Sequence, residues 1–223
     1  HFVGGWPYGY SSWCVDLTPF ANYGGTNVLA IRLDNPPESS RWYPGAGIYR
    51  NVWLVKTDPV HIGQWGTQIT YAPNSFLAGE SVPTNVVHVR TTIENQSRRA
   101  GDGILETTLL DPKGKEVARA RQPFSASANA SSEVEQAFAV ADPQLWSPDS
   151  PRLYQAVSQV LINGAEKDRL ETTFGLRSFQ FTTTNGFLLN GKRVYIRGVC
   201  LHQDYGALCT ALNDTGTIAN RQT

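Results

Sequence analysis

The sequence contains no methionine and only three cysteines among its 223 residues. An odd and small number of cysteines excludes a disulfide scaffold. Free thiols are therefore the simplest interpretation of Cys14, Cys200 and Cys209, with a Cys200–Cys209 bridge left open. The chain opens on His1-Phe2-Val3 without a charged and apolar leader, so we expect a fragment cut at both ends or a processed product.

An excess of charge of either sign is also missing. Nineteen basic and nineteen acidic side chains give a formal charge of zero, and no basic stripe concentrates them. Phosphate backbones are bound by clustered Lys and Arg, so nucleic acid is excluded as an expected partner. No apolar run approaches the roughly 20 residues that cross a bilayer, so we expect no membrane partner either.

Motifs for metals and cofactors are lacking as well. A zinc site needs clustered Cys and His, whereas the four histidines (His1, His61, His88 and His202) are scattered. The sequence has no Gly-rich phosphate loop and no Gly-x-Ser-x-Gly elbow. We therefore expect no metal site and no cofactor.

Helical periodicity is almost absent, and this absence indicates the fold class. Hydrophobic residues make up 40% of the chain, enough for a core, and they alternate or come in short runs. Turn residues interrupt them about every 8 to 12 positions, which is typical of β-sandwiches. The sequence therefore predicts a mainly β chain.

The first part of the chain predicts two strands. Asn27–Leu33 would place Leu29, Ile31 and Leu33 on one face, and the prolines that follow would end it. Tyr49–Lys56 reads as the second strand. We place a domain boundary near residues 57–59.

The second part predicts about seven strands in about 115 residues, which suits an immunoglobulin-like sandwich. Asp111–Gly114 is an expected turn, Asn163-Gly164 is expected to form a type I′ hairpin, and Ser125–Glu133 reads as a loop or an edge. The clearest strands, besides one that starts at Val60, are Val86–Ile93, Ile104–Leu110, Glu116–Gln122, Tyr154–Ile162 and Arg169–Phe174.

The third part begins near Arg177. Asn185-Gly186 and Asn190-Gly191 are two close turns, and Val194–Ile196 is an apolar run expected to be a strand covered on both faces. A polar stretch with His202 and Asp204 follows. This order is typical of the entry to a (β/α)₈ barrel, which needs about 250 residues.

Three stretches could contact a ligand. Arg41 and Trp42 lie in an aromatic string, Ser40–Leu54, and the segment Trp6–Trp13 is also rich in aromatics. Aromatic faces stack on sugar rings and guanidinium groups donate to hydroxyls, but the same residues could serve to pack neighbouring domains. In the third stretch, His202 and Asp204 could bind sugar hydroxyls or form structural polar contacts.

Three strings together resemble glycoside hydrolase family 2, in its β-galactosidase-like branch. They are Ser40–Leu54, Asp16–Pro19, and Phe187–Val199 followed by His202, and the resemblance runs from Phe2 to about Asn213. It implies that residues 1–57 are the C-terminal part of a jelly-roll sugar-binding domain. Residues 58–178 would be an immunoglobulin-like sandwich, and residues 179–223 the opening hairpin and first strand of a truncated catalytic barrel.

The resemblance also implies an activity and a site. The family hydrolyses terminal β-linked sugars with retention, using two glutamates about 5 Å apart. Both lie on later barrel strands, so we expect this chain to lack them. His202 matches the family's first-strand His, with Asp204, Arg41 and Trp42 as further candidate sugar contacts. Arg41 falls near a position where the family places an Asp, so galactose specificity is not implied. A periplasmic or extracellular location is slightly favoured by the resemblance.

Three functions stay open on these grounds. The leading one is a β-galactosidase-like glycoside hydrolase, present as a fragment that is inactive alone. The alternatives are a non-catalytic carbohydrate-binding or assembly module, and a small hydrolase that uses other acids such as Asp16, Asp34, Glu38 or Asp204. Half a jelly roll would expose a sheet edge and an apolar face, so we also expect either a homo-oligomer that completes it or missing strands supplied by another chain.

Overall fold

The computed structural model describes residues 1–9, 11–38, 47–48, 51–75, 77, 79 and 84–198. Within them strands dominate, and the single helical element is η1 (Thr18–Phe20), three residues of 3₁₀ helix. The described residues divide into two compact units, one up to Val52 and one from Trp53 onward. The predicted mainly β class is confirmed. In the described part of the chain no helix has the length and apolar character needed to cross a bilayer.

The first unit holds η1 but no strand among its described residues. Asp16 Oδ1 accepts a hydrogen bond at 2.8 Å from the amide of Thr18, the first residue of η1. The strand expected at Asn27–Leu33 does not form, and Val28 is 88% exposed. Residues 51–56 of the second expected strand, Tyr49–Lys56, also form no ladder. A strand needs a neighbour for its backbone hydrogen bonds, and none of the described segments pairs with either of these.

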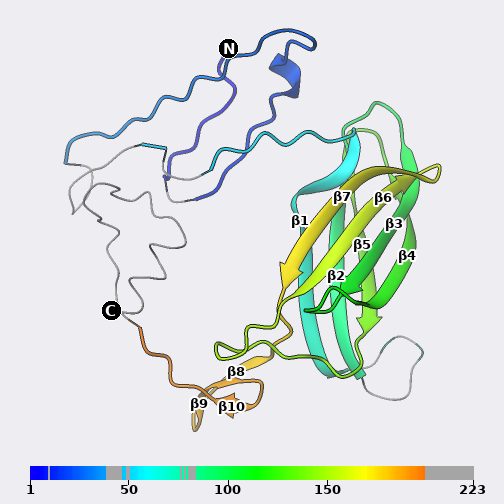
Figure 1. Ribbon diagram of the computed structural model, residues 1–223. Helices are drawn as coiled ribbons and strands as arrows, with labels where there is room; N and C mark the ends of the chain where they lie inside the picture. The colour runs from blue at the N-terminus through cyan, green and yellow to red at the C-terminus, as the bar shows by residue number, and fades with distance from the viewer. Residues whose placement is uncertain are drawn as a thin grey trace. The chain divides into compact units, whose positions relative to one another are not determined.

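The second unit contains a β-sandwich, as predicted. Its two antiparallel sheets have the strand orders β1-β2-β5 and β4-β3-β6-β7, and they form the two layers seen in Figure 1. The strands are β1 (Val60–Ser75), β2 (Thr84–Asn95), β3 (Gly101–Leu110), β4 (Glu116–Ala126), β5 (Ala130–Ala139), β6 (Tyr154–Ile162) and β7 (Ala165–Phe174). Each strand expected from the sequence between Val60 and Phe174 is present.

The stretch Ser125–Glu133, expected to be a loop or an edge, contains the end of β4, a turn over residues 127–129 with Asn129 at φ +50°, and the start of β5. Both strands lie at an edge of their sheet. The strand ends were not recognised from the sequence because most residues of this stretch are small and polar. Their side chains face solvent, while Phe124, Ala126 and Val134 face the core. The connection carries the chain from the four-stranded sheet to the three-stranded one.

The two turns expected from residue type are confirmed. Asn163 and Gly164 have φ values of +50° and +80°, both positive as a type I′ turn requires. At the other turn, Asp111 Oδ1 accepts hydrogen bonds from the amides of Lys113 and Lys115 at 2.8 and 2.9 Å. These donors stabilise the ionised carboxylate and hold the pKa of Asp111 below its usual value.

A buried polar layer divides the core of the sandwich into two apolar clusters. The layer consists of Thr91, Thr107, Gln136 and Ser158, one each from β2, β3, β5 and β6. Each of these residues points into the core, and the inward-facing residues on either side of it in the same strand are apolar. Thr107, for example, lies between Leu105 and Leu109. The apolar residues on the two sides of the layer form separate clusters.

Hydrogen bonds satisfy most of the polar layer. The hydroxyls of Thr107 and Ser158 lie 3.2 Å apart across β3 and β6. Gln136 Nε2 donates to the carbonyl oxygens of Leu105 and Ala120 at 3.2 and 3.3 Å, which ties β5 to the opposite sheet. The hydroxyl of Thr91, by contrast, is buried without a partner among the described residues.

After β7 the chain forms a small antiparallel sheet with the order β10-β9-β8. Its strands are β8 (Phe179–Thr182), β9 (Gly186–Leu189) and β10 (Lys192–Arg193). The buried strand expected at Val194–Ile196 is not formed. Tyr195 is 70% and Ile196 71% exposed, because no described strand lies beside them to cover either face.

The polar layer gives a first test. Replacing Thr91 by Val keeps the shape of the side chain and removes a buried hydroxyl that has no partner among the described residues. We expect the free energy of unfolding to rise by about 1 kcal/mol, measured by urea unfolding. Thr107→Val is the matched control. It leaves the Ser158 hydroxyl unpaired, so we expect a loss of about 1 kcal/mol. Equal losses in both variants would contradict the distinction.

Candidate functional site

The four residues expected to contact sugar, Arg41, Trp42, His202 and Asp204, lie outside the described residues. So do Cys200 and Cys209. The aromatic segment near the N-terminus is described except for Tyr10, and its large rings are exposed: Trp6 by 55%, Tyr8 by 59% and Trp13 by 43%.

The sandwich has one irregular strand, which sequence reasoning did not identify. In β1, Ile62 pairs with Ile93 and Thr67 pairs with Thr91. The four residues between Ile62 and Thr67 therefore face the single residue Thr92 of β2, and the strand bulges outward. Bulges of this kind bend an edge strand and re-aim its side chains. The available signal was a pair of glycines, Gly63 and Gly66, inside a predicted strand.

The bulge places Trp65 in an unusual conformation. Its φ is +56°, in the left-handed region that bulky side chains rarely adopt, and its side chain is 64% exposed. Gly66 is required next to it, because a Cβ at that position would lie 2.7 Å from the carbonyl oxygen of Gly63. The backbone of the bulge is therefore folded tightly on itself, and it holds an indole in solvent.

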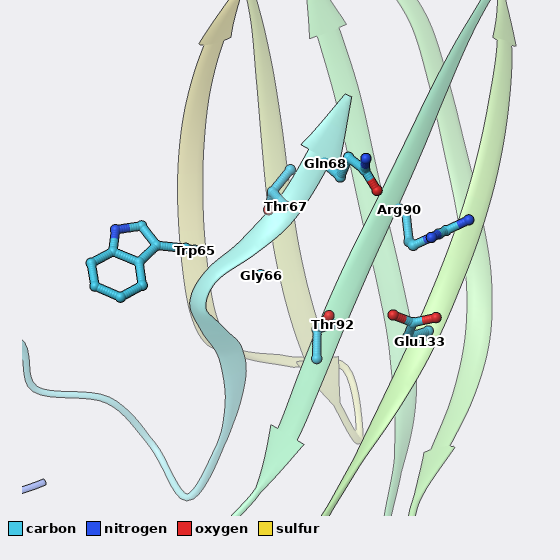
Figure 2. A pocket seen from close by; sticks show the side chains of 7 residues that line it. All are labelled: Trp65, Gly66, Thr67, Gln68, Arg90, Thr92 and Glu133. Carbon is cyan, nitrogen blue, oxygen red and sulfur yellow. The ribbon is translucent and has the colours of Figure 1, made fainter. Parts of the chain in front are cut away.

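A shallow depression of about 420 Å³ lies beside the bulge, on the outer side of the three-stranded sheet. It is lined by Trp65, Gly66, Thr67, Gln68, Arg90, Thr92 and Glu133. Figure 2 shows the indole of Trp65 turned away from the strands that carry Arg90 and Glu133. The depression therefore offers hydrogen-bonding groups rather than an aromatic platform.

The charges at the depression are partly compensated. Arg90 is paired with Glu135, with a shortest distance of 2.8 Å from its guanidinium to a carboxylate oxygen. Glu133 forms no ion pair among the described residues. Both partners of the Arg90–Glu135 pair are largely exposed, so solvent screens it and it contributes little to stability.

Several other described acids of the second unit are in structural ion pairs. Glu106 lies 3.5 Å from Arg119 and 3.0 Å from Arg121, and Glu171 lies 2.9 Å from Arg169. No group of three or more His, Cys, Asp or Glu side chains among the described residues could hold a metal ion.

The acids proposed as catalytic alternatives have other surroundings. The hydroxyl and amide of Thr18 hydrogen-bond to Asp16 and hold its pKa below the usual value, so it is ionised at neutral pH. A proton donor needs the opposite shift. Asp34 and Glu38 are exposed.

The chain is similar to known proteins over most of its length. Residues 79–177 match the model of glycosyl hydrolases family 2. The chain is 41% identical over 208 residues to the β-galactosidase BoGH2A of Bacteroides ovatus, covering 93% of this chain and 24% of that protein. It is 30% identical over 213 residues to a β-glucuronidase of Bacteroides fragilis, covering 92% of this chain and 30% of that protein.

A solved structure is similar over nearly the whole chain. A glycosyl hydrolase family 2 member from Bacteroides cellulosilyticus superposes with a TM-score of 0.88 at 34% identity, covering 99% of this chain and 29% of that one. The chain thus spans between about a quarter and a third of the length of these three relatives.

The bulge gives a second test. A methyl group in Gly66→Ala would meet backbone that cannot move aside, so we expect the free energy of unfolding to fall by about 1–3 kcal/mol in urea. Gly198→Ala is the control, because a Cβ there meets nothing within 4 Å. A Gly66→Ala variant as stable as the Gly198→Ala control would show that the bulge is not tightly folded.

Proposed function

The chain belongs to glycosyl hydrolase family 2, and we propose that it forms the accessory β-domain region of a β-galactosidase-like enzyme that hydrolyses terminal β-linked sugars. The observation that carries this proposal is the 41% identity to a β-galactosidase across 93% of the chain. The identity covers 24% of that enzyme, so the activity is proposed for the whole protein and the supporting role for these residues.

We propose the following division of the chain. Residues 1–57 would belong to a jelly-roll sugar-binding domain, residues 58–178 to the sandwich, and residues 179–223 to the start of a catalytic barrel. In support, the strands β1 to β7 fall between Val60 and Phe174, and the small sheet begins at Phe179. A homo-oligomer that covers the first unit is part of this proposal, and the exposure of Val28, Leu29 and Leu33 supports it. A monomer in light scattering would contradict it.

In this proposal the catalytic pair of glutamates is not contributed by these residues. Retaining glycosidases need two carboxyl groups about 5 Å apart, one of them able to donate a proton. Glu106, Glu135 and Glu171 instead lie in ion pairs with arginines. His202, Asp204, Arg41 and Trp42 keep their proposed role as sugar contacts.

A hydrolysis assay on the purified 223-residue chain tests whether these residues carry catalysis. We expect no release of nitrophenol from nitrophenyl β-galactoside or nitrophenyl β-glucuronide above the buffer rate. Turnover that is abolished when one of the chain's own acids is replaced, for example in Asp204→Asn, would overturn the proposal and favour a small hydrolase.

A second candidate function is carbohydrate binding without catalysis. It is favoured by the exposure of Trp6 and Trp13, since exposed aromatic rings suit stacking on sugars. Calorimetric titration of the chain with galactose and with lactose is the measurement. Saturable binding that is lost in Trp6→Ala or Trp13→Ala but kept in Trp53→Ala, a variant at another exposed tryptophan, would support it. A flat titration would remove it.

A further inference from the structure

The connection between β7 and β8 packs closely against a loop of the sandwich. Gly175 lies so near Trp146, in the β5–β6 connection, that a Cβ would approach the Trp146 Cβ to 2.9 Å. The Trp146 amide donates to the carbonyl oxygen of Leu176 at 2.8 Å, and Leu176 is fully buried. The guanidinium carbon of Arg177 lies 4.8 Å from the centre of a Trp146 ring.

Asn190, in the turn between β9 and β10, bonds to both of these segments. Its backbone amide donates to the carbonyl oxygen of Ser178 at 2.8 Å, and its Oδ1 accepts from the Ser178 amide at 3.0 Å. Its Nδ2 donates to the carbonyl oxygen of Trp146 at 3.0 Å. One side chain of the small sheet is thus bonded both to the β7–β8 connection and to the sandwich.

The loop that presents the Trp146 carbonyl is itself held in place. Ser147 and Ser150 exchange backbone hydrogen bonds at 3.0 and 3.1 Å, and the Gln144 amide donates to the Tyr154 hydroxyl at 2.9 Å. Tyr154 belongs to the core of the sandwich. The acceptor for Asn190 is therefore connected to the packed interior by a short chain of contacts.

Turn chemistry alone does not require these bonds. The Asn163-Gly164 turn has nearly the same backbone, with φ values of +50° and +80° against +51° and +75° for Asn190-Gly191. Asn163 nevertheless makes no side-chain hydrogen bond to the described residues. An asparagine before glycine is sufficient for the turn, so the cross-segment bonds of Asn190 are an additional feature.

We propose that Trp146, Gly175–Ser178 and Asn190 form a joint that fixes the small sheet on the sandwich, with Asn190 as its positioning residue. Only Gly191 and β10 lie between the joint and Val194, so the joint limits where the following segment begins. The joint itself rests on the contacts above. Only its consequence, that the sandwich orients the first strand of a catalytic barrel, rests on the proposed function.

Distance measurement between two spin labels tests the joint. The labels are attached at Ala137→Cys on β5 and Thr184→Cys in the β8–β9 turn, both exposed, in a chain whose Cys14, Cys200 and Cys209 are replaced by Ser. Asn190→Asp retains an acceptor for Ser178 but loses the donor to Trp146. Asn163→Asp makes the same chemical change in the matched turn. Circular dichroism melting establishes that each variant is folded.

We expect one narrow distance distribution in the parent chain and in Asn163→Asp. Losing a hydrogen bond of this kind shifts the ratio of closed to open forms by about two- to ten-fold, so Asn190→Asp is expected to broaden the distribution or add a second distance at unchanged melting temperature. A distribution as narrow in Asn190→Asp as in the parent would overturn the role of Asn190. A broad distribution in the parent would overturn the joint. Neither result bears on the hydrolysis assay, so the two proposals fail separately.

Discussion

The inward-facing rows of the two sheets impose the constraint on which the second unit depends. Side chains alternate between the faces of a strand, so a shift of one residue in β3 would turn Leu105 and Leu109 outward and Glu106 inward. The polar layer restricts the possible strand registers further. Thr107 meets Ser158 only in the observed register of β3 and β6 within one sheet, and Gln136 reaches the carbonyl of Leu105 only in the observed arrangement of the two sheets. Apolar burial thus drives the stacking, and the hydrogen bonds select one arrangement.

The irregular features lie where this constraint is weakest. The bulge at Trp65 occurs in β1, an edge strand of its sheet. At an edge, four residues can lack ladder hydrogen bonds without disturbing the packing of the core. A positive φ at a bulky residue costs about 1–3 kcal/mol and persists only when surrounding structure enforces it. Here the regular pairing on either side of the bulge, Ile62 with Ile93 and Thr67 with Thr91, supplies that enforcement.

The supporting role that we propose agrees with the contacts of the described residues. Glu106 and Glu171 lie beside arginines, and the depression next to Trp65 is shallow and polar. The contacts of Asn190, by contrast, connect a core residue such as Tyr154 to the small sheet through Trp146. Under the proposed function, the physical contribution of the sandwich would be to hold the neighbouring strand in a defined direction.

Local patterns in the sequence determined most of the sandwich. Alternation fixed strands such as Tyr154–Ile162, and Asn163-Gly164 fixed its turn, because both signals act between residues close in the chain. Tertiary structure alone decided three other matters. The segment Asn27–Leu33 has strand chemistry but no described partner, since pairing depends on a distant segment. The bulge at Trp65 and the bond from Asn190 to Trp146 likewise depend on residues that are neighbours in space but not in the chain. The sugar contacts expected at Arg41 and His202 lie outside the described residues. Local propensity shows what a segment can form, whereas packing decides which neighbours it meets.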